Sequence, residues 1–326
     1  MLGNAQRKGF AEQSLTRYPG HHFFMFLWYN EVMVRRSKKS RNKFLRRVFS
    51  AEGAIVALMV VALVASTVGL VNNLEIYDYV VETNAFFAPF EYYDNRKIVG
   101  VDIEIIDRVA EKLNKKIDVK NVEFDVIIDN VAEGIIADAG AAGITITPAR
   151  EEKVNFSIPY YTSVQYVIYN KNAEPEVRDG HILWDSLAGK TLGSQTGGTE
   201  YLFMSDEIEN GVLKDTKTVA KGFDSHQLAA DAIGAHIIDY AIADELPAHY
   251  IVSKNPDLAA LPLYYRGETV ELDYPTEESY AIAVNKERPE LLEAFNEVLT
   301  EMLQVGEDGE TELDKLILKY MGLTNE

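Results

Sequence analysis

The segment Gly143–Arg150, with the sequence GITITPAR, combines the features of a strand with those of a helix start. Its two isoleucines alternate with two threonines, which is the period of a half-buried strand. Thr147 then occupies an N-cap position, and Pro148 the first position of a helix. Arg150 follows in the first turn, where the helix dipole does not favour a cation. Its guanidinium suits a carboxylate ligand, although a lone arginine is more often a solvated surface residue.

Around this segment, short apolar strands alternate with amphipathic helices from residue 74 onward. Strands are predicted at Ile76–Thr83, Ile117–Val122, Ala137–Thr147, Tyr166–Asn170, Thr191–Ser194, Tyr240–Ala243 and Tyr280–Val284. Helices are predicted at Val101–Leu113, Asp125–Glu133, from Thr199, at Ser225–Ala235, Leu246–Val252, Pro289–Gln304 and Glu312–Lys319. This alternation predicts an α/β fold with mostly parallel sheets.

Two further polar features follow predicted strands. Gln195–Thr199 (QTGGT) has two glycines ahead of a helix, so its backbone N–H groups could hold an anion; a plain strand-to-helix turn is the alternative. Asp244 lies at the carboxyl end of strand Tyr240–Ala243, where open α/β sheets bind ligands. It could receive an ammonium group or cap the next helix, and the residue alone favours capping.

Composition excludes several classes of protein. The 326 residues carry 51 Asp and Glu against 32 Lys and Arg, a net charge of −19, which disfavours a nucleic-acid partner. There is no cysteine, and therefore no disulfide, thiolate metal site or cysteine nucleophile. The histidines have no metal-ligand spacing, and no G-x-S-x-G motif is present. We expect no metal, no cofactor and no catalytic residue.

The N-terminal region has the charge pattern of an exported protein. Residues 1–53 form a basic segment that ends just before an uncharged apolar run at residues 54–71. A basic stretch before an apolar one indicates export, and this run is long for a signal peptide and just long enough for a membrane anchor. Both readings stay open, with a preference for the anchor. Residues 1–32 fit the pattern poorly, so we expect translation to begin at Met33 or Met25.

Several motifs in this order resemble the extracellular solute-binding proteins of polar amino acid ABC transporters. Besides the three polar features above, the matching segments are Thr83–Glu91 (TNAFFAPFE), Gly100–Glu104 (GVDIE), Phe156–Tyr161 (FSIPYY) and Tyr280–Val284 (YAIAV). The resemblance implies a type 2 periplasmic-binding fold, in which two α/β lobes are joined by two hinge crossings. Carried over to this chain, residues 74–162 and 283–326 form lobe 1, and residues 163–282 form lobe 2.

The resemblance also implies a site for a free amino acid in the cleft between the lobes. Arg150 would bind the α-carboxylate and Asp244 the α-ammonium, while Phe87 and Phe124 would enclose the side chain. Further contacts are implied for the Gly143 backbone N–H, Thr145, Gln195, Gly197 and Thr199. Asn84 stands where an acid is common in members that bind basic side chains, so it argues against lysine or arginine as the ligand. The sequence does not identify the amino acid.

The resemblance implies an extracytoplasmic protein that delivers its ligand to the membrane permease of an ABC transporter. The N-terminal run would tether it to the membrane if uncleaved. One alternative is a ligand-sensing module, for which we expect a separate signalling partner because the chain stops soon after the last predicted helix. Another is a dehydratase-type enzyme on the same fold, which would need an acid or base in the cleft.

Overall fold

The computed structural model describes residues 55–56, 58–63 and 76–323, and the chain divides into two units, Met1–Glu75 and Ile76–Glu326. In the first unit, residues 55–56 and 58–63 are helical. No helix within the described residues is both long enough and apolar enough to cross a membrane. The rest of the predicted 54–71 segment, the basic segment 1–53 and the predicted start sites lie outside the described residues.

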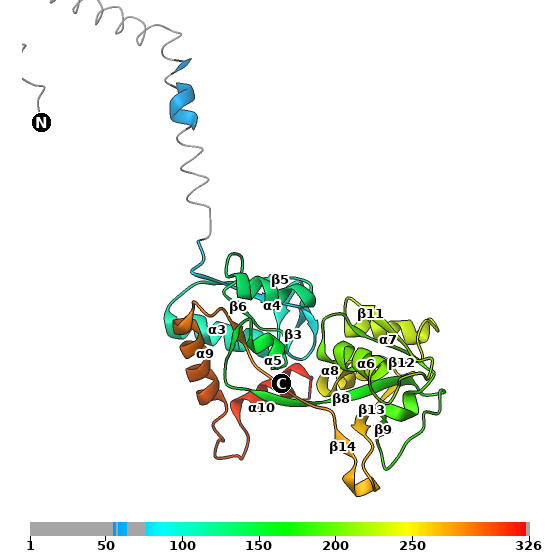
Figure 1. The fold of residues 1–326 in the computed structure, drawn as a ribbon. Helices are drawn as coiled ribbons and strands as arrows, with labels where there is room; N and C mark the ends of the chain where they lie inside the picture. Colours follow the sequence, from blue (N-terminus) through cyan, green and yellow to red (C-terminus); the bar gives the residue numbers. More distant parts are fainter. Residues whose placement is uncertain (1–54, 57, 64–75, 324–326) are drawn as a thin grey trace, which may run out of the picture. The chain divides into compact units, whose positions relative to one another are not determined.

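The second unit contains two lobes, each built on its own sheet (Figure 1). The sheet of lobe 1 has the strand order β5 (Ile117–Asn121), β1 (Tyr79–Thr83), β6 (Ala139–Gly140), β16 (Ala283–Val284) and β7 (Asn155–Phe156). A smaller sheet beside it contains β2 (Phe86–Phe87), β3 (Glu91–Asp94) and β4 (Lys97–Val99).

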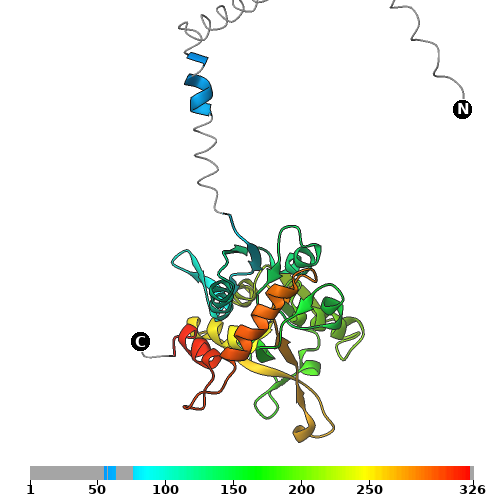
Figure 2. The ribbon, with the colours of Figure 1, turned by 90° about the vertical axis from the view of Figure 1, so that its left-hand side faces the viewer.

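Two apolar clusters hold lobe 1 together. In one, Val81 of β1 packs with residues of α3 (Val101–Leu113), α9 (Pro289–Met302) and α10 (Glu312–Tyr320). In the other, α4 (Phe124–Glu133) packs with Ile144, Val154 and Ala283. The apolar residues of α3 and α9 recur at helical spacing, and each helix therefore presents one apolar face to the sheet. Figure 2 shows α9 (orange) from outside the lobe.

Lobe 2 has a larger sheet. Its main strand order is β11 (Val219–Phe223), β10 (Thr191–Gln195), β12 (Tyr240–Asp244), β8 (Tyr161–Asn170), β13 (Leu258–Tyr265) and β14 (Tyr274–Pro275), and β9 (Ile182–Leu183) pairs with β13. One apolar cluster joins α6 (Thr199–Glu209) to Trp184 of η1 (Trp184–Leu187). Another joins α7 (His226–Gly234) to α8 (Glu245–Lys254). A 3₁₀ helix, η2 (Val270–Leu272), precedes β14.

The lobes are connected by two paired strands. The first residues of β8 pair antiparallel with β15 (Glu277–Tyr280), and the later residues of β8 pair with β12 in the lobe 2 sheet. In Figure 1, β8 runs as one long strand from lobe 1 into lobe 2. These two crossings and the two α/β lobes are the arrangement that the sequence predicted.

The structure corrects two predictions about the sheets. Ala137–Thr147 is not one strand: β6 covers only Ala139–Gly140, and Thr145 makes an isolated bridge to Tyr280. Gly143 has a φ of 53°, a left-handed conformation that interrupts the extended backbone. The sheets are also mixed rather than mostly parallel, because the chain returns through each sheet after crossing between the lobes. The β2–β4 sheet and β13 were not predicted.

Helices were predicted more accurately than strands. Val101–Leu113 begins and ends where the periodicity indicated, and α6 begins at Thr199 as expected. The short helix α5 (Pro148–Glu151) has Thr147 as its N-cap, whose hydroxyl accepts a hydrogen bond from the Arg150 backbone N–H at 3.3 Å. The helix start read from the segment Gly143–Arg150 is therefore confirmed.

Candidate functional site

A small cavity lies between the two lobes. The space among its lining residues is about 240 Å³, including the part that is open to solvent. Lobe 1 and lobe 2 both line it, through Phe87, Phe124, Ala142, Gly143, Thr145, Gln195, Gly198, Thr199, Glu200, His226 and Asp244. Seven of the ten predicted site residues are in this set. Within the described chain, the other three (Asn84, Arg150 and Gly197) are next to the lining without forming part of it.

Arg150 is buried beside the cavity rather than solvated. Its side chain is held by α5, and the residue is only 8% exposed. Nη1 donates to the Thr145 carbonyl at 2.8 Å, and Nη2 donates across the cleft to the Gly197 carbonyl at 3.0 Å. The guanidinium carbon lies 5.6 Å from the centre of the Phe124 ring, within range of a cation–π contact. The alternative that Arg150 is a solvated surface residue is therefore wrong.

Asp244 points into the cleft and does not cap the helix that follows it. It occupies the N-cap position of α8, but its side chain makes no capping hydrogen bond. Instead Oδ2 accepts a hydrogen bond from the Tyr280 hydroxyl at 2.5 Å, while Oδ1 is buried with no hydrogen-bond partner among the described residues. Burial raises the pKa of Asp244 well above its usual value, and the charges of Glu278 and Glu200 raise it further.

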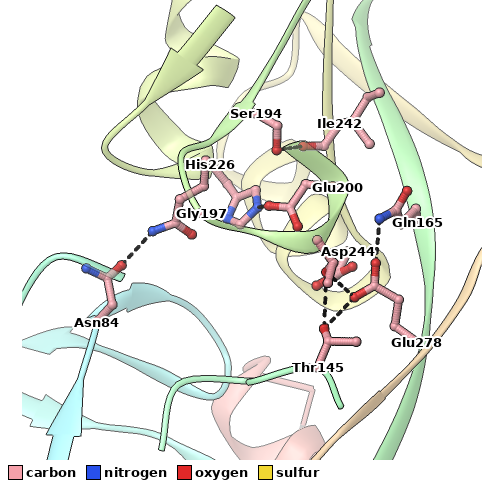
Figure 3. Close-up of polar contacts among 12 residues, drawn as sticks. Asn84, Thr145, Gln165, Ser194, Gly197, Glu200, His226, Ile242, Asp244 and Glu278 are labelled. Atoms are coloured by element: carbon pink, nitrogen blue, oxygen red, sulfur yellow. Dashed lines mark hydrogen bonds and ion pairs between the residues drawn. The ribbon is translucent and has the colours of Figure 1, made fainter. Parts of the chain in front are cut away.

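Two more acids join Asp244, and neither was predicted. Carboxylate oxygens of Glu200, Asp244 and Glu278 lie within 4.8 Å of one another (Figure 3). Glu278, on β15, accepts hydrogen bonds from the hydroxyls of Thr145 and Thr199, each at 2.5 Å. Burial and the charge of Glu200 raise the pKa of Glu278, against the effect of its hydrogen bonds. Three oxygen ligands could hold a hard cation such as Mg²⁺ or Ca²⁺ or an ammonium group.

Glu200 is paired with His226, another residue that the sequence reasoning missed. His226 Nε2 is hydrogen-bonded to Glu200 Oε1, and both side chains are almost fully buried. Burial raises the pKa of Glu200, but the charge of His226 and its hydrogen bond outweigh this effect and lower it. Both residues stand at helix starts: Glu200 directly follows Thr199, and His226 follows the N-cap Ser225. Their position in the first turn of a predicted helix is the sequence feature that could have identified them.

Asn84 and Gln195 connect the lobes. Gln195 Nε2 donates to Asn84 Oδ1 at 2.9 Å, and Asn84 Nδ2 donates to the Val122 carbonyl at 2.7 Å. Both groups of the Asn84 amide are therefore engaged by protein atoms. The expectation that Asn84, in place of an acid, argues against lysine or arginine as the ligand stays a prediction.

Gly143 contributes to the cavity because it has no side chain. The prediction that its N–H is available to a ligand is wrong, because that N–H donates to Asp102 Oδ2 at 3.1 Å. A Cβ at Gly143 would lie 2.3 Å from the Phe87 ring, and only glycine therefore lets this aromatic wall approach. Phe87 also packs on His226, with 5.3 Å between the ring centres. Phe124 forms the other aromatic wall.

Behind this wall, lobe 1 contains a separate pair of buried acids, Glu91 and Asp102. Asp102 accepts from Gly143 and from the Tyr160 hydroxyl at 2.7 Å, and burial raises the pKa of Asp102 to about 6. Glu91 is 0% exposed. Burial, followed by the neighbouring Asp102, raises the pKa of Glu91 well above its usual value. A protonated Glu91 next to an ionised Asp102 keeps this pair at a single negative charge.

Comparisons with known proteins agree with this architecture. The profile of the bacterial extracellular solute-binding proteins, family 3, matches residues 79–322. The chain is 29% identical over 240 residues to the arginine-binding extracellular protein ArtP of Bacillus subtilis (strain 168), a match that covers 73% of this chain and 84% of ArtP.

Solved structures of amino acid-binding proteins have the same fold. One is an amino acid ABC transporter substrate-binding protein, AbpA from Streptococcus pneumoniae Canada MDR_19A, bound to L-arginine: TM-score 0.63, 28% identity, covering 76% of this chain and 96% of AbpA. Another is an ancestral arginine-binding protein bound to arginine: TM-score 0.61, 31% identity, covering 74% of this chain and 97% of that protein.

Proposed function

This chain belongs to the bacterial extracellular solute-binding proteins, family 3, and we propose that it binds a free amino acid between its lobes and delivers it to the permease of an ABC transporter. The family consists of binding proteins and not of enzymes, in agreement with the expectation from the sequence that this chain is not an enzyme. The amino acid ligands named for its relatives support this class of ligand for the present chain.

One observation carries the proposal: a buried guanidinium and a buried carboxylate with a free oxygen flank the same cavity. Arg150 lies on the lobe 1 side, and Asp244 Oδ1 on the lobe 2 side. An amino acid zwitterion presents one negative and one positive group a short, fixed distance apart. Each would be buried on binding, and each therefore needs an opposite charge. We assign the α-carboxylate to Arg150, in exchange for the Gly197 carbonyl, and the α-ammonium to Asp244.

The other predicted site residues have supporting roles in this proposal. Thr145, Thr199 and Gln195 contribute polar atoms to the wall, and Phe87 and Phe124 its apolar surface. Gly143 leaves space for the Phe87 ring because it has no side chain, and the Gly197 carbonyl accepts a hydrogen bond from Arg150. Asn84 holds Gln195 in place through a hydrogen bond. Charge-assisted hydrogen bonds contribute roughly 1.5–3 kcal/mol each. Three or four of them, less the costs of ordering and desolvation, are compatible with about −8 kcal/mol, or micromolar binding.

A ligand held by both lobes would favour the closed arrangement. Arg150 projects from lobe 1 and Asp244 from lobe 2, so a single zwitterion bonds to both only when the lobes are together. This differential contact is what shifts a hinge equilibrium towards closure. We infer that the closed form is the one recognised by the permease. The proposed lobes are residues 74–162 with 283–326, and residues 163–282.

The proposed location is extracytoplasmic, with export or anchoring by residues 54–71. The extracellular character of the family supports the location, and the basic segment before the apolar run supports the orientation.

A thermal-shift screen with the twenty amino acids tests the proposal, followed by calorimetry on each compound that raises the melting temperature. We expect at least one free amino acid to bind with a Kd of about 1 μM to 100 μM and to stabilise the protein by mass action. Binding by none of them at millimolar concentration would contradict the function. In cells, deletion of the gene should reduce uptake of the same amino acid.

A further inference from the structure

Four parts of the molecule meet at the carboxylate of Glu278. This residue lies on β15, where β15 pairs with β8 between the lobes, and it is only 4% exposed. Oε2 accepts from Thr145 of lobe 1 and Thr199 of lobe 2, each at 2.5 Å. Oε1 accepts from the side-chain amide of Gln165 on β8. One acid therefore contacts both lobes and both crossing strands (Figure 3).

This arrangement fixes the polarity of the two threonines. A hydroxyl has a single proton to donate and two lone pairs to accept with. When Glu278 is ionised, Thr145 and Thr199 both direct their protons to it at 2.5 Å, in preference to the longer 3.2 Å contact between the two hydroxyls, and only lone pairs are left for the cavity that they line. Together with the free Oδ1 of Asp244, this part of the wall consists of hydrogen-bond acceptors. Such a wall binds N–H donors on cationic groups and repels carboxylates.

The charges in the wall are not balanced. The carboxyl groups of Glu200, Asp244 and Glu278 lie together, and Arg150 interacts electrostatically with all three. Glu200 is paired with His226, and the other two acids, Asp244 and Glu278, exceed the one guanidinium by one negative charge when both are ionised. A ligand with no net charge would leave that excess buried. A ligand with one additional positive charge would remove it, which is favourable because an uncompensated buried charge is costly.

We propose that Glu278 makes the cavity selective for cationic amino acids, because it accepts hydrogen bonds from both threonine hydroxyls and, when ionised, adds a negative charge that Arg150 alone does not neutralise. The inference rests on the proposed function and adds the class of ligand. The aromatic walls formed by Phe87 and Phe124 suit this class, since a guanidinium or alkylammonium group is attracted to the face of an aromatic ring.

Arginine and citrulline provide a direct test, because they have nearly the same shape and differ in the charge of the terminal group. Calorimetry with the full-length wild-type chain is expected to show at least tenfold tighter binding of arginine than of citrulline. In Glu278→Gln the ratio should fall to less than threefold, mainly through weaker binding of arginine. Glu277→Gln is the matched control, because the neighbouring acid on β15 is exposed and should leave the ratio unchanged.

Equal binding of arginine and citrulline by the wild-type protein would overturn the inference, and this measurement does not depend on how a variant folds. A uniform loss for both ligands in Glu278→Gln, with the ratio preserved, would also overturn it by reducing Glu278 to a structural role. If the wild type binds neither compound but binds neutral or acidic amino acids, the proposed function stands and only the ligand class fails. Failure to bind any amino acid contradicts the proposed function itself.

Discussion

The molecule buries acids in two places and compensates for them in different ways. Glu91 and Asp102 are sealed in lobe 1 with no cationic side chain acting on either of them within the described residues, and their raised pKa values favour retention of a proton. The acids of the cleft lie next to Arg150 and His226, and one of their oxygens, Asp244 Oδ1, is buried without a hydrogen-bond partner among the described residues. The sealed pair retains one proton and supports structure, whereas a cleft acid can ionise when a ligand cation binds next to it.

The largest expected effect comes from removing either charge assigned to the zwitterion. Arg150→Ala and Asp244→Ala should each weaken amino acid binding by at least about 30-fold, or about 2 kcal/mol, because each leaves a buried ligand charge unpaired. Calorimetry on the folded variants measures the loss. Wild-type affinity in either variant would show that its side chain is not part of the site.

Binding should also depend on pH through the cleft acids. The pKa values of Asp244 and Glu278 are raised, while a bound ammonium group favours their ionised forms. Ligand binding therefore releases protons, and affinity should fall as the pH drops through the raised pKa range, by up to about tenfold per unit for one proton. Titrations between pH 8 and pH 5, in two buffers of different ionisation enthalpy, measure both effects. Binding that is independent of pH would exclude this coupling.

The sealed pair should show the opposite behaviour, with an effect on stability and none on binding. The pKa of Glu91 is higher in the folded than in the unfolded chain, so the folded state holds its proton more tightly and loses relative stability as the pH rises above the unfolded value. Glu91→Gln imitates the protonated acid. It should raise the free energy of unfolding by about 1 kcal/mol at pH 8 and by much less near pH 4.

Urea denaturation at the two pH values checks this prediction, with ligand affinity as the control. A twofold or smaller change in Kd is expected. If Glu91→Gln alters the affinity as strongly as Asp244→Ala, the two sets of acids do not differ in the way described.

The smallest effect is expected at the bridge between Asn84 and Gln195. Gln195→Ala removes one neutral hydrogen bond between the lobes, worth about 0.5–1.5 kcal/mol. Affinity should fall by a few-fold, and Asn84→Ala should give a similar loss because it breaks the same bond. The double variant should be no weaker than either single one. Additive losses would mean that the two residues contact the ligand independently.

The sequence predicted the elements that local patterns specify. The periodicity of α3, and the N-cap and proline of α5, are properties of neighbouring residues, and they located the helices and placed Arg150. The strand through Gly143 was wrong because a left-handed glycine interrupts it, and a strand pattern does not reveal the conformation of one residue. The N–H of Gly143 was misassigned because its acceptor, Asp102, is 41 residues away in the chain.

The unpredicted cleft residues illustrate the same limit. Glu278 acts where two crossing strands pair, and its partners Thr145 and Thr199 are 133 and 79 residues away. Alternation along β15 indicates which face Glu278 shares with Tyr280, but the neighbours of that face follow from the tertiary fold alone. The spacing of the histidines gave no signal for His226, because its pairing with Glu200 joins two different helices of lobe 2.

The central claim is that the cleft holds an amino acid by both of its charges, and one measurement on the unmodified protein tests it most directly. Calorimetry should compare the best amino acid from the screen with its α-hydroxy analogue, which keeps the carboxylate and side chain but lacks the ammonium group. The expected result is a loss of at least about 30-fold, since Asp244 would face an uncharged hydroxyl. Equal affinity for the two compounds would contradict the account.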